Sequence, residues 1–230
     1  MKDTILYHGS RGGLEGNITP TSRVKTDFGR GFYLGTNKNQ AKGLVANEKN
    51  AVIYTMKLKL SEIPEDRILV LSGQDWLYTV LANRQRWEKF NELAISQTYI
   101  DLVKNYDVII GPIADDRMNS SVESFIANAL TDTGLKACLK AVDYGQQYVL
   151  KTPFACSKIE IINSYEMSEK EKDDAYAYCR YLQAEGDIVV NNAIEEYQRQ
   201  GLYFNEIIKK ERELEKSSLN NDLGDDDYER

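Results

Sequence analysis

The chain has 230 residues, of which 42% are hydrophobic, 28% charged and 10% aromatic, so it can bury a full core in one or two domains. No run approaches the roughly 18 uninterrupted apolar residues of a membrane-spanning helix, and the N-terminus lacks a cleavable signal pattern, so we expect a cytoplasmic protein without a membrane partner. The single histidine and the three distant cysteines, which form no C-x-x-C pair, argue against a metal site and a disulfide framework.

The net charge of −7 conceals an asymmetry along the chain. Residues 165–230 carry 18 acidic and 9 basic side chains, whereas residues 1–164 carry 18 acidic and 20 basic ones. The slight positive excess of the front region is compatible with a small anionic ligand, but nothing resembles the broad basic surface that follows a nucleic-acid backbone. We therefore do not expect non-specific nucleic-acid binding.

The first 164 residues alternate short runs of β-branched and aromatic residues with helical patterns. Strands are predicted at residues 4–7, 51–58, 67–71, 107–111, 136–142, 147–151 and 157–162. Helices are predicted at about 39–48, 74–81, 86–95, 97–104 and 120–130. Several strands follow one another without a helix long enough for a parallel crossover, so the predicted fold class is α+β.

From about Tyr165 the pattern becomes helical. Ser168 and Glu171 form a capping-box signature, and helices are predicted at about 168–182, 187–200 and, after Gly201, 203–215. Residues 217–230 carry five acidic side chains against one basic one and no periodic apolar positions, which favours disorder. We thus predict a domain of residues 1–164, a helical extension of residues 165–216 packed on it, and an acidic disordered tail of residues 217–230.

The first segment with candidate chemistry is His8-Gly9-Ser10, at the end of a short apolar strand. A strand end leaves the N–H and C=O of Gly9 unpaired, and the missing Cβ lets a flat ligand lie against the backbone. Both groups are complementary to a primary amide, with Ser10 as a further partner, and His8 could donate to a sugar hydroxyl. A solitary histidine at a strand end is more often structural, so this segment does not decide the function.

The second segment, residues 27–34, reads DFGRGFYL. Gly29 and Gly31 bracket Arg30 and predict a tight turn that feeds a strand, which presents the ring of Tyr33 for stacking on a planar heteroaromatic. The third segment, QQYVL, opens a strand with the polar amide of Gln147. A hairpin turn with core aromatics and a strand edge with glutamines remain open as purely structural alternatives.

In this order the segments resemble the motifs of the ADP-ribosyltransferase superfamily, in the branch of the poly-ADP-ribose polymerases and diphtheria toxin. The polymerases carry H-G-S, F-G-K-G-I-Y and E-Y-I-V, where this chain has H-G-S, F-G-R-G-F-Y and Q-Y-V-L. More closely, YHGS, DFGRGFYL followed by NQA, and DVIIGPIADD resemble an uncharacterised bacterial family placed in that superfamily, the domain of unknown function 3990. The resemblance covers residues 1–164.

The resemblance implies split antiparallel sheets that clasp NAD in a cleft. Gly9 would hold the nicotinamide amide with help from Ser10, His8 would bind the adenosine-side ribose, and Tyr33 would stack on the nicotinamide. The turn residues assigned to the NAD site are Phe28, Gly29, Arg30 and Gly31. Gln147 would occupy the position of the catalytic glutamate of the polymerases.

A glutamine at that position has a chemical consequence. The amide of Gln147 can hydrogen-bond the ribose but cannot act as a general base, so we expect single transfers to a macromolecular acceptor rather than chain elongation. Asp115 and Asp116 are candidate bases, with a solvated turn as the alternative.

The family association suggests a toxin of a toxin-antitoxin or conflict system, with a neutralising antitoxin protein as partner. The alternative functions are a catalytically weak NAD or ADP-ribose-binding module, an NAD glycohydrolase, and an interaction domain without a ligand.

Overall fold

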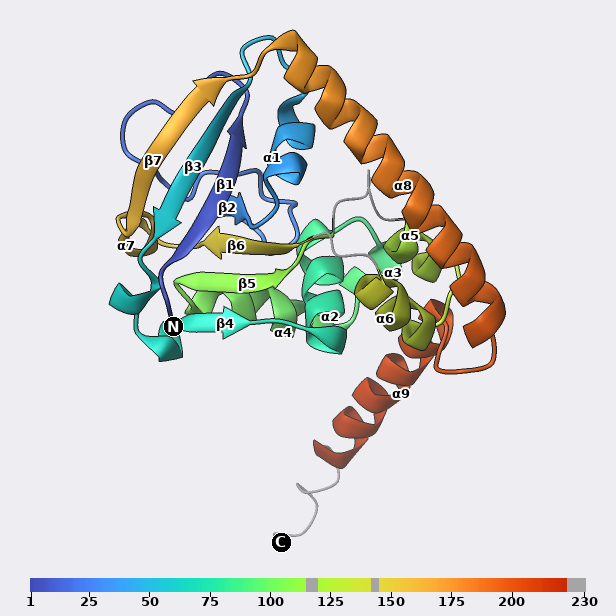
Figure 1. Ribbon diagram of the computed structural model, residues 1–230. Helices are drawn as coiled ribbons and strands as arrows, with labels where there is room; N and C mark the ends of the chain where they lie inside the picture. The colour runs from blue at the N-terminus through green and yellow to red at the C-terminus, as the bar shows by residue number, and fades with distance from the viewer. Residues whose placement is uncertain (115–119, 142–144, 223–230) are drawn as a thin grey trace, which may run out of the picture.

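Seven strands form one mixed sheet in the computed structural model, which describes residues 1–114, 120–141 and 145–222, the last four as backbone (Figure 1). The strands are β1 (Thr4–Ser10), β2 (Phe32–Gly35), β3 (Val52–Leu58), β4 (Ile68–Val70), β5 (Val108–Pro112), β6 (Gln146–Leu150) and β7 (Ile159–Glu166). Their order is β4-β5-β6-β2-β1-β3-β7, with β4 and β5 parallel and the other neighbours antiparallel. The α+β prediction is confirmed, but the strands form a single mixed sheet rather than two purely antiparallel ones.

Strands β1 and β2 are the least paired neighbours in the sheet. One register pair, Tyr7 with Gly35, joins them, whereas β1 pairs with β3 along all seven of its residues. Strand β2 pairs along its whole length with β6 instead. The two strands therefore diverge beyond Tyr7, and we call the space between the last residues of β1 and strand β2 the seam.

Helices surround this sheet on its faces and at one end. They are α1 (Lys38–Val45), α2 (Gly73–Arg84), α3 (Glu88–Asn91), α4 (Ala94–Leu102), α5 (Ser121–Ile126), α6 (Asp132–Ala141), α7 (Pro153–Cys156), α8 (Glu169–Tyr197) and α9 (Phe204–Asp222), with short 3-10 turns at Leu60–Glu62, Glu65–Arg67 and Val103–Asn105. Helix α1 begins at the Asn37 cap, whose side chain accepts from the N–H groups of Asn39 and Gln40.

The sheet is buried on both faces around β5 and β6. Ile109 and Val149 belong to the cluster under α2 and α4, while Val108, Ile110 and Leu150 belong to the cluster on the opposite face. This assignment follows the period of two, because successive side chains of a strand point to opposite faces. A strand covered on both sides needs continuous apolar residues, which is what the sequence VII at 108–110 supplies.

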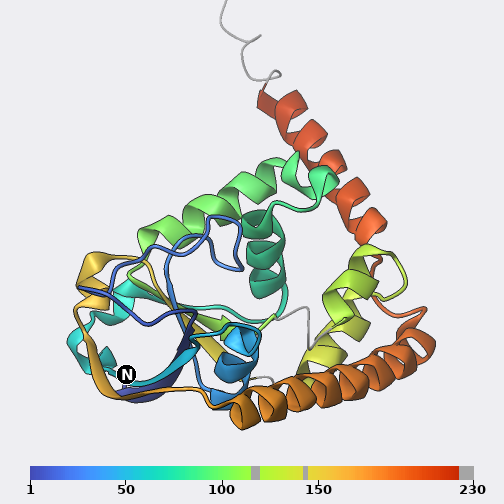
Figure 2. The same cartoon turned by 90° about the horizontal axis from the view of Figure 1, so that it is seen from above.

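The helical extension completes the core of the front region. Helix α8 runs past α1 to α6, as both views show (Figures 1 and 2). Phe204, Ile207 and Ile208 of α9 enter the cluster that contains Trp76 of α2. Helix α9 continues to Asp222, into the segment predicted to be disordered, and residues 223–230 lie outside the described part of the chain.

Two sequence-based element predictions are wrong. Residues 136–142 were assigned to a strand but lie largely in α6, where Leu135 and Cys138 are buried three positions apart, on one face of a helix. The two helices predicted over residues 168–200 are one helix, α8, because Gly186 occupies a place in its buried stripe and does not interrupt it. None of the helices in the described ranges combines the length and apolar composition that a bilayer crossing requires.

Candidate functional site

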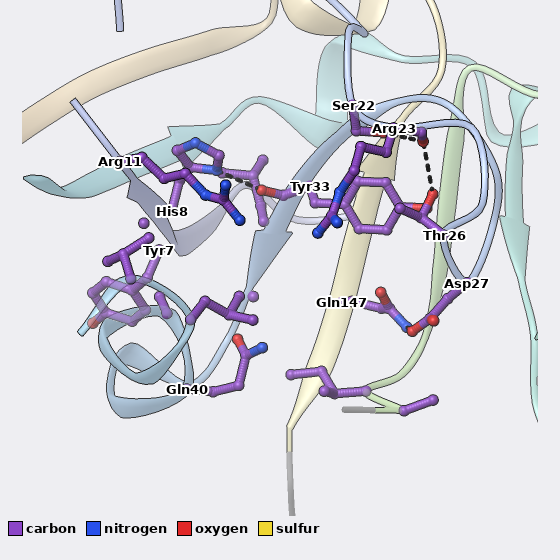
Figure 3. Close-up of a pocket in the computed structure, with 18 of the residues that line it drawn as sticks. Tyr7, His8, Arg11, Ser22, Arg23, Thr26, Asp27, Tyr33, Gln40 and Gln147 are labelled. Carbon is purple, nitrogen blue, oxygen red and sulfur yellow. Dashed lines mark hydrogen bonds between the residues drawn. The ribbon is translucent and has the colours of Figure 1, made fainter. Parts of the chain in front are cut away.

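A pocket of about 800 Å³ opens at the seam. Its walls come from β1, β2, β6, α1, the end of α2 and the loop of residues 21–27 (Figure 3). The pocket brings together four residues that the sequence singled out: His8, Gly9, Tyr33 and Gln147. These residues are up to 139 positions apart, so the sheet order, with β6 beside β2 and β2 beside β1, is what collects them.

His8 links the two sides of the seam. Its Nδ1 lies 2.8 Å from the carbonyl oxygen of Tyr33, and its ring stacks on Phe32 at a centroid distance of 4.5 Å. Because a carbonyl oxygen only accepts, Nδ1 carries the proton and donates. Burial lowers the pKa of His8 below 6.5, so the imidazole is neutral at pH 7 and its Nε2 is an acceptor. A sugar hydroxyl would therefore donate to His8, rather than accept from it as the sequence suggested.

Position 9 must be a glycine because helix α1 packs closely against it. A Cβ at this position would overlap the carbonyl oxygen of Ala41 and lie 3.1 Å from the side chain of Val45, both in α1. The space left by the missing Cβ is thus filled by α1 and is not open to a flat ligand. Contact between Gly9 and a ligand is limited to the main-chain edge of β1, beyond its last pairing with β2.

Tyr33 is held by its hydroxyl group. The hydroxyl donates to the carbonyl oxygen of Gly29 (2.7 Å), accepts from the N–H of Phe28 (3.1 Å) and lies 2.8 Å from Oγ1 of Thr26. Burial and the nearby charge of Asp27 raise the pKa of Tyr33, so the phenol stays protonated. These contacts fix the ring in the pocket wall and tie the loop that carries Asp27 to β2.

Gln147 belongs to a buried chain of polar groups. Its Nε2 donates to Oδ2 of Asp27 (2.8 Å) and to the carbonyl oxygen of Pro112 (3.0 Å). The other carboxylate oxygen of Asp27 accepts from Nε of Arg84 at 2.7 Å, and Arg84 Nη2 donates to the carbonyl oxygen of Ala114. The side chains of Arg84 and Asp27 are 7% and 15% exposed, so this ion pair is shielded from water.

The pocket carries an excess of positive charge although the whole chain carries −7. Five lining residues are cationic, namely Arg11, Arg23, Lys25, Arg84 and Arg86, and two of them also pair with carboxylates outside the lining, Arg11 with Glu48 (3.3 Å) and Arg86 with Glu123 (3.9 Å). Asp27 is the one carboxylate among the described lining residues. Figure 3 shows Arg11 and Arg23 reaching into the hollow in front of His8 and Tyr33. This charge distribution suits an anionic ligand.

Five other predicted site residues do not line the pocket: Ser10, Phe28, Gly29, Arg30 and Gly31. The hydroxyl of Ser10 donates to the carbonyl oxygen of Gly13 at 2.8 Å, which turns it away from a ligand role. Phe28 has no exposed surface and packs in the core. Arg30 is exposed.

Gly29 and Gly31 serve the turn itself. Gly29 has a φ of +70°, which favours glycine, and a Cβ on Gly31 would overlap the side chain of Val149 in β6. They therefore shape the pocket wall without contacting its interior.

Asp115 and Asp116, the candidate bases, lie outside the described residues. Within residues 1–114, 120–141 and 145–222, no cluster of three or more His, Cys, Asp or Glu residues could hold a metal ion.

The sequence patterns do not identify Asp27 and Arg84 as site residues. Asp27 lies in the segment DFGRGFYL, but its partners Arg84 and Gln147 are 57 and 120 positions away, and no local signal indicates them.

One family model matches the chain, over residues 4–161, and its description is "Protein of unknown function (DUF3990)". No curated protein and no solved structure matches the chain. The matched segment includes every pocket residue named above and ends within β7, so the helical extension lies outside it.

Proposed function

The chain belongs to the family of proteins of unknown function DUF3990, and from this premise we propose that it is an NAD-dependent mono-ADP-ribosyltransferase that modifies a macromolecular acceptor. The observation that carries the proposal is the convergence of His8, Tyr33 and Gln147 on one positively charged pocket. The sequence resemblance assigns the same three positions to NAD.

Each part of NAD has a complementary group in the pocket. Arg11 and Arg23 supply charge for the diphosphate, and the main-chain edge at Gly9 can hold the nicotinamide amide. The ring of Tyr33 lies in the wall where a nicotinamide could stack. With these assignments, the pocket would bind NAD in the way that the resemblance to the ADP-ribosyltransferases implies.

The bond to be broken joins nicotinamide to the ribose. As it breaks, the bonding electrons leave with nicotinamide, which departs as a neutral molecule, and positive charge develops on the sugar. Gln147 can accept a hydrogen bond from a ribose hydroxyl through Oε1, while the carboxylate of Asp27 lies directly behind its amide. A carboxylate at this position, as in the polymerases, would also stabilise the developing charge, and losing one such preorganised group typically costs about 3 kcal/mol of barrier. The Gln147 amide supplies only the hydrogen bond.

The nature of these groups also limits the reaction. Neither the amide of Gln147 nor the Asp27 carboxylate, which is bound to Arg84, is free to take a proton from an acceptor. We therefore propose a single transfer, in which a nucleophilic atom of the acceptor bonds to the ribose carbon that nicotinamide leaves and releases its proton to water, so the acceptor must need little activation. A toxin role with a neutralising antitoxin partner is the biological setting that the family resemblance suggests.

The proposal is tested with NAD labelled on the adenylate and a cell lysate. We expect label on a macromolecule with wild-type protein and a loss of at least 100-fold with His8→Ala or Tyr33→Ala. The matched control is Gln146→Glu, which changes an exposed neighbour of Gln147 and leaves labelling unchanged. Labelling that persists in both pocket variants would refute the proposal.

A catalytically silent NAD or ADP-ribose-binding module is the second candidate, and the amide at position 147 favours it. The two functions differ in the release of nicotinamide. A thermal shift with NAD and no nicotinamide release, with lysate or without it, would establish the binding module. Nicotinamide release without a labelled macromolecule would instead establish an NAD glycohydrolase.

A further inference from the structure

The chain of polar groups through Asp27 has a fixed direction. Arg84 can only donate, because a guanidinium has no acceptor. Asp27 can only accept while it is ionised, so both of its oxygens receive a proton donor: Nε of Arg84 on one and Nε2 of Gln147 on the other. The carbonyl oxygen of Pro112 also accepts from Nε2 of Gln147.

The orientation of the Gln147 amide follows from its two neighbours. Since Asp27 Oδ2 and Pro112 O are both acceptors, the nitrogen of the amide must face them, and Oε1 must face the other way. Figure 3 shows this oxygen on the side of Tyr33 and the nitrogen toward Asp27. In the part of the chain that the structure describes, no hydrogen bond engages Oε1.

We propose that Asp27 is a positioning residue that holds the Gln147 amide with Oε1 toward the pocket, as the acceptor for a hydroxyl group of the ligand. This role in binding rests on the proposed function, because NAD supplies the ribose hydroxyl. The direction of the network itself does not depend on the ligand.

The same geometry explains why an amide, rather than a carboxylate, stands at position 147. A glutamate there would place one of its oxygens about 3 Å from the Asp27 carboxylate and from the carbonyl oxygen of Pro112, in place of a donor. Two carboxylates at this distance cannot both be ionised without a large penalty. A glutamate at this position would therefore be destabilising beside Asp27, because one of the two carboxyls would have to hold a proton.

A reciprocal exchange tests the network. In Asp27→Asn/Gln147→Glu, the new asparagine can keep Oδ1 on Arg84 and turn Nδ2 to the new glutamate, which restores one donor between the two side chains. In Asp27→Asn alone, Arg84 imposes the same orientation on the asparagine, whose Nδ2 then faces the Gln147 nitrogen. The amide either keeps its bond to Pro112 O against this second donor, or reverses, loses that bond and presents its nitrogen to the pocket. Gln147→Glu alone brings two carboxylates together.

The four proteins are compared by thermal unfolding at pH 8 and by calorimetry with NAD. We expect Gln147→Glu to lower Tm by about 4 °C or more, and the double variant to recover at least half of that loss. We expect Asp27→Asn to weaken NAD binding at least tenfold, and the double variant to bind more tightly than either single variant. Gln146→Glu adds a carboxylate to the same strand, away from Asp27, and leaves Tm and affinity unchanged.

Each part has an outcome that overturns it. A double variant whose Tm loss equals or exceeds the summed losses of the single variants overturns the network, whether or not NAD binds. Wild-type affinity for NAD in Asp27→Asn overturns the positioning role. If wild-type protein binds no NAD, the proposed function and the ligand role fail together, while the Tm coupling still decides the network.

Wild-type protein supplies a further measurement that does not depend on the variants folding. The side-chain NH₂ resonances of Gln147, assigned as the pair missing from Gln147→Met, should both exchange slowly with solvent, because both protons are in hydrogen bonds. Fast exchange of both would overturn the inference.

Discussion

Asp27 and Asp107 are two carboxylates that each pair with an arginine, yet they serve different parts of the molecule. Asp107 precedes β5 and accepts from Nε of Arg67 (3.0 Å), from its Nη2 (3.3 Å) and from the hydroxyl of Thr152 (2.7 Å). All of these partners lie away from the pocket. Asp27 accepts from Arg84 and Gln147, and both of these partners line the pocket.

The two ion pairs differ in the third residue, which donates a hydrogen bond to the aspartate: Thr152 for Asp107 and Gln147 for Asp27. Thr152 also caps α7 and so belongs to a closed structural arrangement. Gln147 instead leaves one oxygen toward the pocket. An ion pair that ends in a bifunctional side chain can orient an acceptor for a ligand, whereas the same pair with all partners inside the protein can only stabilise the fold.

The largest expected difference between the two pairs is in stability. Arg84→Met leaves the Asp27 carboxylate in a shielded site without its cation, which should lower the free energy of unfolding by about 3 kcal/mol or more. Arg67→Met should cost less, because the Arg67 side chain is 42% exposed and water screens its ion pair with Asp107, although Asp107 itself is only 9% exposed. Urea denaturation of both variants measures the difference. Equal losses would contradict the distinction between the two pairs.

A smaller effect is expected in the acid stability that Asp107 provides. The hydrogen bond from Arg67 lowers the pKa of Asp107 below the ordinary 3.8. A carboxyl with a depressed folded-state pKa contributes stability above its unfolded-state value, and this contribution is lost as the pH falls through the folded-state pKa.

Asp107→Asn should therefore be less stable than wild type at pH 7, by about 1 kcal/mol or less, and the gap should narrow below pH 3.8. Denaturation at pH 7 and pH 3 measures this gap. NAD binding should be unaffected, in contrast to Asp27→Asn. A gap that widens in acid would show that the Arg67 pair does not stabilise the ionised carboxyl.

The smallest expected effect is the pH dependence of stability that His8, a pocket residue, contributes. Burial lowers its pKa below 6.5, so the native state binds fewer protons than the unfolded state just below that pH. The free energy of unfolding should therefore fall as the pH drops through 6.5 toward the folded-state pKa. The chain has one histidine, so nitrogen-15 NMR can follow its titration and tautomer without ambiguity.

The expected tautomer has its proton on Nδ1, the atom that donates to Tyr33. His8→Asn should remove the decrease in stability between pH 7.5 and 5.5. A histidine that titrates above 6.5, or one with its proton on Nε2, would contradict the assigned role of His8 at the seam.

The sequence by itself determined most of the elements and the local geometry of the pocket walls. The strands around residues 51–58, 107–111 and 147–151 and the cap of α8 follow from short-range patterns, since period, turn residues and capping act over a few residues. The strand of Tyr33 also follows, because the turn before it needs a residue with positive φ, which Gly29 supplies.

Only the tertiary structure decided how these pieces work together. The pairing of Asp27 with Arg84 and Gln147, the closure of the Gly9 face by α1, and the entry of α9 into the core join residues far apart in the chain. The direction of a hydrogen-bond chain depends on which donors and acceptors meet in space, and no sequence spacing encodes that. Compared with the polymerase motif, Gln147 only replaces a carboxylate. In the folded chain, Asp27 lies beside Gln147 and fixes the orientation of its amide, so that Oε1 can accept a hydrogen bond.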